Sequence, residues 1–303
     1  MEITDLFKDK VVAELLLARK NFGGDDKFDA KFARSMDINP SIFSRIKKGE
    51  RNGLLSSATW LRLGREFNVS TNTRKWNAVE TEVFVLIRED ILFCKQHSKS
   101  LIFVDNCGIG KTFTAKYLSK TLKNCFYLDC TQCKKKNEFI KALARIVGVE
   151  VKGKIVDIKE NTKYYLSMLE SPVIIIDEAG ALDKDALGMV QEYWNATEGL
   201  VGWYMMGANA LRNKISTGVS KDKDYFAELF SRFSETFSSI VPTEKGKQAV
   251  IDFYLKLIND VVSANISDRT KLNLIVKQCL VSKEDNRITG LRRAESLIIL
   301  NNA

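Results

Sequence analysis

The strongest restriction on the fold comes from residues 105–112, DNCGIGKT, which stand between the apolar run LIFV and the helical pattern FTAKYLSKTL. Gly108 and Gly110 let backbone N–H groups turn inward with no Cβ in the way, at a helix N-terminus whose dipole favours negative charge. Strand, glycine turn, Lys-Thr pair and helix together predict a phosphate-binding loop. We expect this loop to hold the ligand through Asn106, Cys107, Gly108, Ile109, Gly110, Lys111 and Thr112.

Two side chains of this loop carry separate tasks. Lys111 is expected to reach the β and γ oxygens of ATP, and the Thr112 hydroxyl to take a place on Mg²⁺. Asp105 stands where the usual pattern has its first glycine. Aspartate tolerates a left-handed backbone better than most residues, but a carboxylate near phosphates is unfavourable unless it points away. The sequence predicts ATP and Mg²⁺ as ligands and leaves the effect of Asp105 open.

A pair of carboxylates, Asp177 and Glu178, follows the apolar run VIII. A strand that ends this way puts both at the carboxyl edge of the sheet, where ligands of open α/β sheets bind. Asp177 is expected to hold the water shell of the metal, and Glu178 to orient and polarise the attacking water. Alone, such a string is as often a strand end with a solvated turn. Beside a phosphate loop it predicts a hydrolytic site.

Patterning divides the chain into three predicted domains, 1–75, 76–242 and 243–303. The first is a bundle of short helices that ends in the polar linker Ser70–Lys75. In the second, strand-length apolar runs at 101–105, 125–130, 173–178 and 201–209 alternate with helices, which is typical of a parallel sheet buried on both faces. The third has helical spacing over 244–264, 268–281 and 289–300. The fold class predicted is α/β with a small all-α domain before it.

These motifs and the trailing helical domain resemble the AAA+ ATPases over roughly residues 80–303. The resemblance implies a P-loop parallel sheet with a C-terminal helical lid. It also implies a polar sensor after a later strand, a place that Asn209 occupies. A helix-capping role for Asn209 is an equal alternative.

Two arginine roles follow from the same resemblance. Arg232, in ELFSRF, would enter the site of a neighbouring subunit, and a surface ion pair is the alternative. Gly290-Leu291-Arg292-Arg293 is similar to the second sensor of the family, which makes Arg293 the contact of the lid with the γ-phosphate. Arg292 is the competing choice.

Residues 29–49 have the register of a helix-turn-helix and resemble the repressor-type DNA-binding fold. Phe32, Phe43 and Ile46 are expected to face inward, with a tight turn at Asp37. Hydroxyls and cations on the outer face favour phosphate contacts and modest sequence selectivity, and a helical protein-interaction module is the alternative. The outward residues expected to bind DNA are Ser41, Ser44, Arg45, Lys47 and Lys48.

Charge supports a polyanionic partner, because the 303 residues carry 47 lysines and arginines against 38 acidic residues, a net charge of +9. Residues 1–76 hold 15 of these basic residues against 10 acidic ones, so the excess gathers at the N-terminal end. Six irregularly spaced cysteines favour reduced thiols. Since no apolar run approaches the length of a membrane span, we expect a cytoplasmic protein.

The order of a repressor-like domain, an AAA+ module and a short lid resembles the transposition ATPases. That resemblance implies a homo-oligomer, a ring or a helical filament formed with ATP. It would coat double-stranded DNA with little sequence preference and respond to a transposase. The alternative is an ATP-gated transcription regulator that binds two half-sites of an operator. A helicase-loader or secretion ATPase is a third interpretation.

Overall fold

The computed structural model describes residues 3–22, 28–67, 69, 76–221, 224–280 and 289–302, so the expected linker Ser70–Lys75 lies outside the described residues. The chain forms two compact units. One combines Met1–Lys75 with Asn137–Leu169, and the other combines Trp76–Lys136 with Glu170–Ala303. A segment from the middle of the chain therefore belongs with the N-terminal residues, and the division into three domains stays a prediction.

The second unit is built on a parallel sheet of five strands in the order β2-β3-β4-β1-β5. Near-continuous apolar runs form the central strands because helices cover both faces, and every residue of β3 and β4 is buried. The predicted α/β fold with a parallel sheet is confirmed. The strands are β1 (Ser100–Val104), β2 (Cys125–Asp129), β3 (Val173–Asp177), β4 (Gly202–Gly207) and β5 (Phe237–Ser238).

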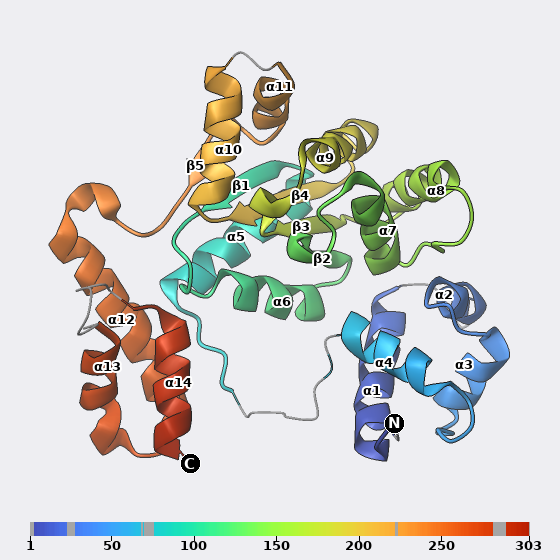
Figure 1. Cartoon of the computed structure of the whole chain (residues 1–303), viewed down its shortest axis with the longest axis horizontal. Helices are drawn as coiled ribbons and strands as arrows, with labels where there is room; N and C mark the ends of the chain where they lie inside the picture. The colour runs from blue at the N-terminus through green and yellow to red at the C-terminus, as the bar shows by residue number, and fades with distance from the viewer. Residues whose placement is uncertain are drawn as a thin grey trace. The chain divides into compact units, whose positions relative to one another are not determined.

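Helices α5 and α6 lie on one face of this sheet, and α9 and α10 lie on the other (Figure 1). Side-chain caps set several helix starts: the Thr81 hydroxyl accepts from the Phe84 N–H at 3.2 Å at the start of α5. The helices beside the sheet are α5 (Glu82–His97), α6 (Lys111–Thr121), α9 (Lys184–Ala196), α10 (Asn209–Ser220) and α11 (Asp224–Arg232).

The lid comprises α12 (Lys247–Asn265), α13 (Leu272–Leu280) and α14 (Leu291–Asn302), which occupy the three predicted helical segments. Leu257 and Ile258 of α12 belong to the same buried cluster as Phe103 of β1 and Tyr204 of β4. The lid and the sheet therefore share one apolar core.

The N-terminal unit has its own core, in which Phe32, Phe43 and Ile46 are buried as expected. Asp37 adopts a φ of 54° in the tight turn before α3. Pro40 stands at the first turn of α3, and the Asn39 side chain accepts from the Ser41 N–H at 2.9 Å. The helices are α1 (Asp5–Asn21), α2 (Asp29–Ser35), α3 (Pro40–Lys47), α4 (Ser57–Glu66), α7 (Lys136–Val147) and α8 (Ile155–Ser167).

Contacts within this unit join α8 and the turn after α7 to the N-terminal helices. The Tyr165 ring stacks on Phe22 with centroids 5.6 Å apart, and Lys152 pairs with Asp37 at 2.5 Å. Gly148 packs directly on Phe22, since a Cβ there would lie 2.1 Å from the ring. The N-terminal bundle and residues 137–169 thus bury surface against each other.

Within the described ranges, the helices are all too short or too polar to cross a membrane.

Candidate nucleotide site

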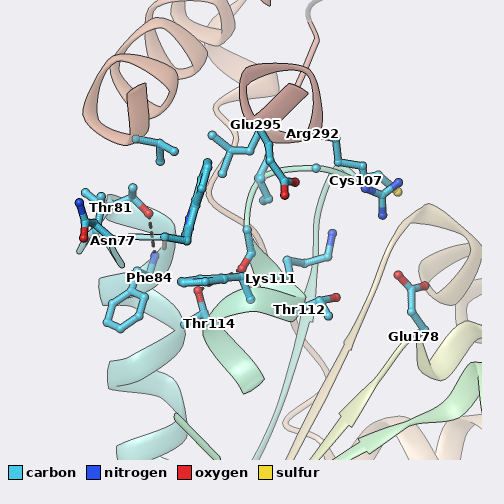
Figure 2. Close-up of a pocket in the computed structure, with 18 residues that line it drawn as sticks. Asn77, Thr81, Phe84, Cys107, Lys111, Thr112, Thr114, Glu178, Arg292 and Glu295 are labelled. Carbon is cyan, nitrogen blue, oxygen red and sulfur yellow. Dashed lines mark hydrogen bonds between the residues drawn. The ribbon is translucent and has the colours of Figure 1, made fainter. Parts of the chain in front are cut away.

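The loop between β1 and α6 borders a cavity of about 420 Å³ (Figure 2). Gly108 and Gly110 take φ values of 77° and 107°, which L side chains rarely adopt, and this explains why the turn needs glycine. Gly110 is the N-cap of α6 and offers no side chain to the first N–H groups of the helix. Those donors suit an anion. Of the predicted loop residues, Cys107, Gly108, Ile109, Gly110, Lys111 and Thr112 line the cavity.

Lys111 is a buried cation held by carbonyl oxygens of its own loop. Its Nζ donates to the backbone oxygens of Asp105 at 2.7 Å and Asn106 at 2.6 Å. Burial lowers the pKa of Lys111. The nearby Cys107 thiol and the carboxylates of Asp105 and Glu178 raise this pKa, but they offset the effect of burial only in part. Because these two acceptors are neutral carbonyl oxygens, the Lys111 ammonium group can exchange them for phosphate oxygens, which are negatively charged and bind it more strongly.

The two residues expected to hold the metal are hydrogen-bonded to each other. Thr112 Oγ1 donates to Asp177 Oδ2 at 2.7 Å, and the hydroxyl of Tyr127 on β2 donates to the same oxygen at 2.9 Å. The Thr112 hydroxyl at the start of α6 and the Asp177 carboxylate at the end of β3 are hard oxygen ligands, so the residues present fit Mg²⁺. When held by Thr112 and Asp177, the ion would neutralise negative charge that develops on the phosphates.

Glu178 lies on the opposite side of the cavity from Thr81 and Phe84 (Figure 2). Its backbone has a φ of 52°, which for a residue other than glycine costs on the order of 1–3 kcal/mol. Its N–H donates to Asp177 Oδ1 at 2.9 Å, which satisfies the second carboxylate oxygen. The strained turn therefore brings the Glu178 side chain to the cavity while it fixes Asp177.

The Asp105 carboxylate points away from the phosphate-binding face. Its Oδ2 accepts from the N–H groups of Ile240 at 2.6 Å and Val241 at 3.0 Å, and its Oδ1 accepts from the Asn106 N–H at 2.7 Å. This answers the question that the sequence left open. Asn106 itself donates from Nδ2 to the Tyr254 hydroxyl at 3.3 Å and is not among the residues that line the cavity.

An apolar part of the cavity was missed by sequence reasoning. Trp76 and Val79 come from the segment before α5, Phe84 from its first turn, and Val261 and Leu291 from the lid. Trp76 and Phe84, two aromatic residues near the start of the second unit, were the available signal. Asn77 ties this segment to the lid, because its Nδ2 donates to the Ala264 oxygen at 2.6 Å.

The lid meets the phosphate loop through α14. The Leu291 N–H donates to the Gly108 oxygen at 2.7 Å, and a Cβ on Gly290 would lie 2.7 Å from that oxygen. The close approach requires glycine at 290. Arg292 lines the cavity (Figure 2), whereas Arg293 is not among its lining residues, so the geometry favours the competing choice for the lid arginine.

Asn209 and Arg232 do not line the cavity as far as the structure describes it. Asn209 is exposed at the first residue of α10, directly after β4, and the N-cap of that helix is Ala208, which makes no side-chain cap. Arg232 Nε donates to Asn195 Oδ1 at 2.6 Å, and its guanidinium lies 5.5 Å from the centroid of Trp194. Arg232 is thus partly buried and has partners on α9.

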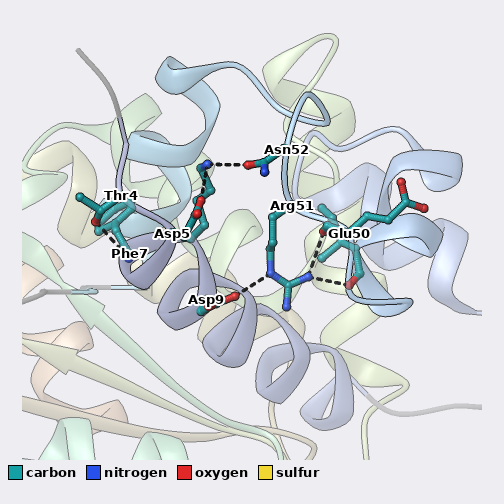
Figure 3. Close-up of polar contacts among 9 residues, drawn as sticks. Thr4, Asp5, Phe7, Asp9, Glu50, Arg51 and Asn52 are labelled. Carbon is teal, nitrogen blue, oxygen red and sulfur yellow. Dashed lines mark hydrogen bonds and ion pairs between the residues drawn. The ribbon is translucent and has the colours of Figure 1, made fainter.

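The predicted DNA face is exposed on α3, and its cations make local contacts. Arg45 pairs with Glu50 at 2.6 Å, and Lys47 pairs with Asp29 at 2.7 Å. Arg51 holds the segment that carries Glu50, since it donates to the backbone oxygens of Ile46 and Glu50 and to Asp9 of α1 (Figure 3). All five residues of the predicted DNA face are exposed: Ser41, Ser44, Arg45, Lys47 and Lys48.

Residues 94–215 match the family model described as an AAA domain. The matched segment runs from the end of α5, through the phosphate loop and Asp177-Glu178, into α10. A comparison with curated proteins found no match. The match over these residues supports a nucleotide-dependent ATPase with a P-loop.

Proposed function

We propose that the protein hydrolyses ATP at the cavity between the phosphate loop and the lid. The observation that carries this proposal is the hydrogen bond between Thr112 and Asp177, with Lys111 and Glu178 on the same cavity. This set joins phosphate donors, metal ligands and a general base in one place.

In this proposal the loop N–H groups and Lys111 hold the phosphates, and the apolar part of the cavity receives the adenine ring of ATP. Glu178 orients a water and accepts its proton as the oxygen attacks the γ-phosphorus, and the bond from that phosphorus to the ADP oxygen breaks. Arg292 of the lid would contact the γ-phosphate, and Asn209 after β4, which does not line the cavity, would serve as the polar sensor residue. Arg232 would serve the site of a neighbouring subunit.

The test is Glu178→Gln, which keeps the shape of the side chain and removes the base. Turnover should fall about 10²-fold or more, while binding of a fluorescent ATP analogue is retained. Glu198→Gln, at an exposed position outside the cavity, is the matched control. Hydrolysis by Glu178→Gln at the wild-type rate would show that the base is another group.

We further propose that the protein assembles with ATP on double-stranded DNA, largely without sequence preference, and marks it as a transposition target. The basic excess of residues 1–76 and the exposed hydroxyls and cations of α3 support DNA binding. The transposase partner rests only on the resemblance of the domain order to the B protein of bacteriophage Mu.

Sedimentation with a long random-sequence duplex, in ATP, in ADP and without nucleotide, tests this assembly. We expect ATP-dependent, salt-sensitive pelleting that Arg232→Ala and Lys48→Glu both reduce, and that Lys277→Glu on the lid does not. Nucleotide-independent binding at one discrete site is the result expected of an operator-binding regulator and would contradict the assembly proposal.

A further inference from the structure

The first residue of the phosphate loop holds the segment that leads into the lid. β5 ends at Ser238 and α12 begins at Lys247, so residues 239–246 carry the chain from the sheet to the lid. In that segment the N–H groups of Ile240 and Val241 both donate to Asp105 Oδ2. Asp105 is only 6% exposed. One carboxylate thus joins the loop to the entrance of the lid.

The buried Val241 amide needs this acceptor, and the half-buried Ile240 amide shares it. β5 pairs with β1 only through Phe237 and Ser238, so the sheet supplies no partner for the residues that follow. Val241 is buried, and a buried N–H without a partner is unfavourable. Glycine, which the usual pattern has at the position of Asp105, carries no side chain that could accept. Asp105 therefore supplies the acceptor that the segment between β5 and α12 requires.

A second tie joins the other end of the lid to the same loop. The Leu291 N–H donates to the Gly108 oxygen at 2.7 Å, and the Gly290 Cα packs on Gly108. Asp105 and Gly108 belong to one tight turn, so the loop is bonded to the lid both where the chain enters it and at the start of α14. Arg292, which lines the cavity, follows this second tie directly.

We infer that Asp105 is a positioning residue that couples the phosphate loop to the lid. By holding Ile240 and Val241 it sets the lid so that Leu291 meets the loop and Arg292 meets the nucleotide. Asp105 itself touches no phosphate, because its oxygens are turned to backbone donors. The statement that Arg292 meets the nucleotide rests on the proposed ATPase function. The coupling between the Asp105 contacts and the contact of Leu291 with Gly108 does not depend on that function.

Hydrogen exchange on the full chain, without nucleotide, measures the coupling. Asp105→Gly should speed exchange of the Ile240 and Val241 amides by about tenfold or more, because a charge-assisted bond is lost. The Leu291 amide, which Asp105 does not contact, should also exchange faster. An unchanged exchange rate of the Leu291 amide would overturn the coupling, since a purely local role of Asp105 changes the exchange of only the Ile240 and Val241 amides.

Asp268→Gly is the matched control, because Asp268 also caps backbone, accepting from the Thr270 N–H at 3.0 Å. It should leave all three amides as in the wild type. Asp105→Asn keeps the shape and a weaker acceptor and should give a smaller acceleration. If Asp105→Gly does not fold, Asp105→Asn decides: wild-type exchange at Leu291 together with faster exchange at Ile240 and Val241 overturns the inference.

Steady-state kinetics add a readout that a merely structural role would not move. Asp105→Gly should lower kcat for ATP more than it raises KM, since the loop N–H groups and Lys111 still hold the phosphates. Equal effects on the two would contradict the inference. If the wild type neither binds nor hydrolyses ATP, the proposed function fails, and the exchange experiment still decides the coupling.

Discussion

Asp177 gathers three donors around one buried carboxylate, and each comes from a different part of the second unit. Thr112 belongs to the phosphate helix, Tyr127 to β2, and the Glu178 N–H to the turn after β3. Burial and the neighbouring Asp177 raise the pKa of Tyr127, so the phenol stays a donor at neutral pH. Tyr127 thereby limits rotation of the carboxylate that is proposed to hold Mg²⁺.

Tyr127→Phe tests this arrangement. Loss of one hydrogen bond of about 1 kcal/mol should raise the Mg²⁺ concentration for half-maximal ATP turnover about fivefold. The rate measured against Mg²⁺ concentration gives this value. Tyr117→Phe, on the half-exposed surface of α6, should leave the Mg²⁺ dependence unchanged. An unaltered dependence in Tyr127→Phe would exclude the positioning role.

Helix α5 and strand β4 are joined by a partly buried polar contact. The Tyr204 hydroxyl donates to Asp90 Oδ2 at 2.9 Å. Burial raises the pKa of the Asp90 carboxyl, and the hydrogen bond from Tyr204 opposes this only in part. The folded protein therefore binds the Asp90 proton more tightly than the unfolded chain does.

The consequence for stability has a definite sign. The contribution of Asp90 is greatest below the unfolded pKa of an aspartate and is lost as the pH rises through its raised folded pKa. Asp90→Asn, which cannot ionise, should remove that decline. Thermal unfolding midpoints between pH 4 and pH 8 measure it, with exposed Asp252→Asn as the control. If the stability of Asp90→Asn declines with pH as much as that of the wild type, other groups cause the decline.

For the whole molecule, the N-terminal unit is assembled from two separated stretches of chain, 1–75 and 137–169. The turn after α7 makes a close contact in this assembly, because Gly148 has a φ of 92° and faces the Phe22 ring. The chain therefore passes through the first two strands of the sheet, β1 and β2, before it returns to this unit.

Gly148→Ala should destabilise the protein by about 1–3 kcal/mol, because it adds a clash with Phe22 to an unfavourable backbone. Gly153→Ala separates the two effects, since Gly153 has a φ of 100° and nothing within 4 Å of its Cβ position. Urea unfolding of both variants measures the difference. Equal losses would show that Gly148 makes no tight contact.

Patterns of neighbouring residues were enough to predict several parts of the protein. Strand and helix periodicity predicted where the glycine turn before Lys111 and Thr112 lies. It also predicted the apolar strand that ends at Asp177. Phe43 and Ile46 face inward on α3 because apolar residues three apart share a helix face. Each of these features is set by local propensity and burial.

Other features depend on residues that are far apart in the sequence. β5 has only two residues and exists because Phe237 and Ser238 pair with β1. The direction of the Asp105 carboxylate depends on amides at 240 and 241. The position of Arg292 at the cavity depends on how α14 meets Gly108. The sequence by itself determined the fold class and the chemistry of the loop, since both are written in local periodicity. Only the tertiary structure decided which donors and acceptors meet, because hydrogen bonds between distant residues leave no periodic signal.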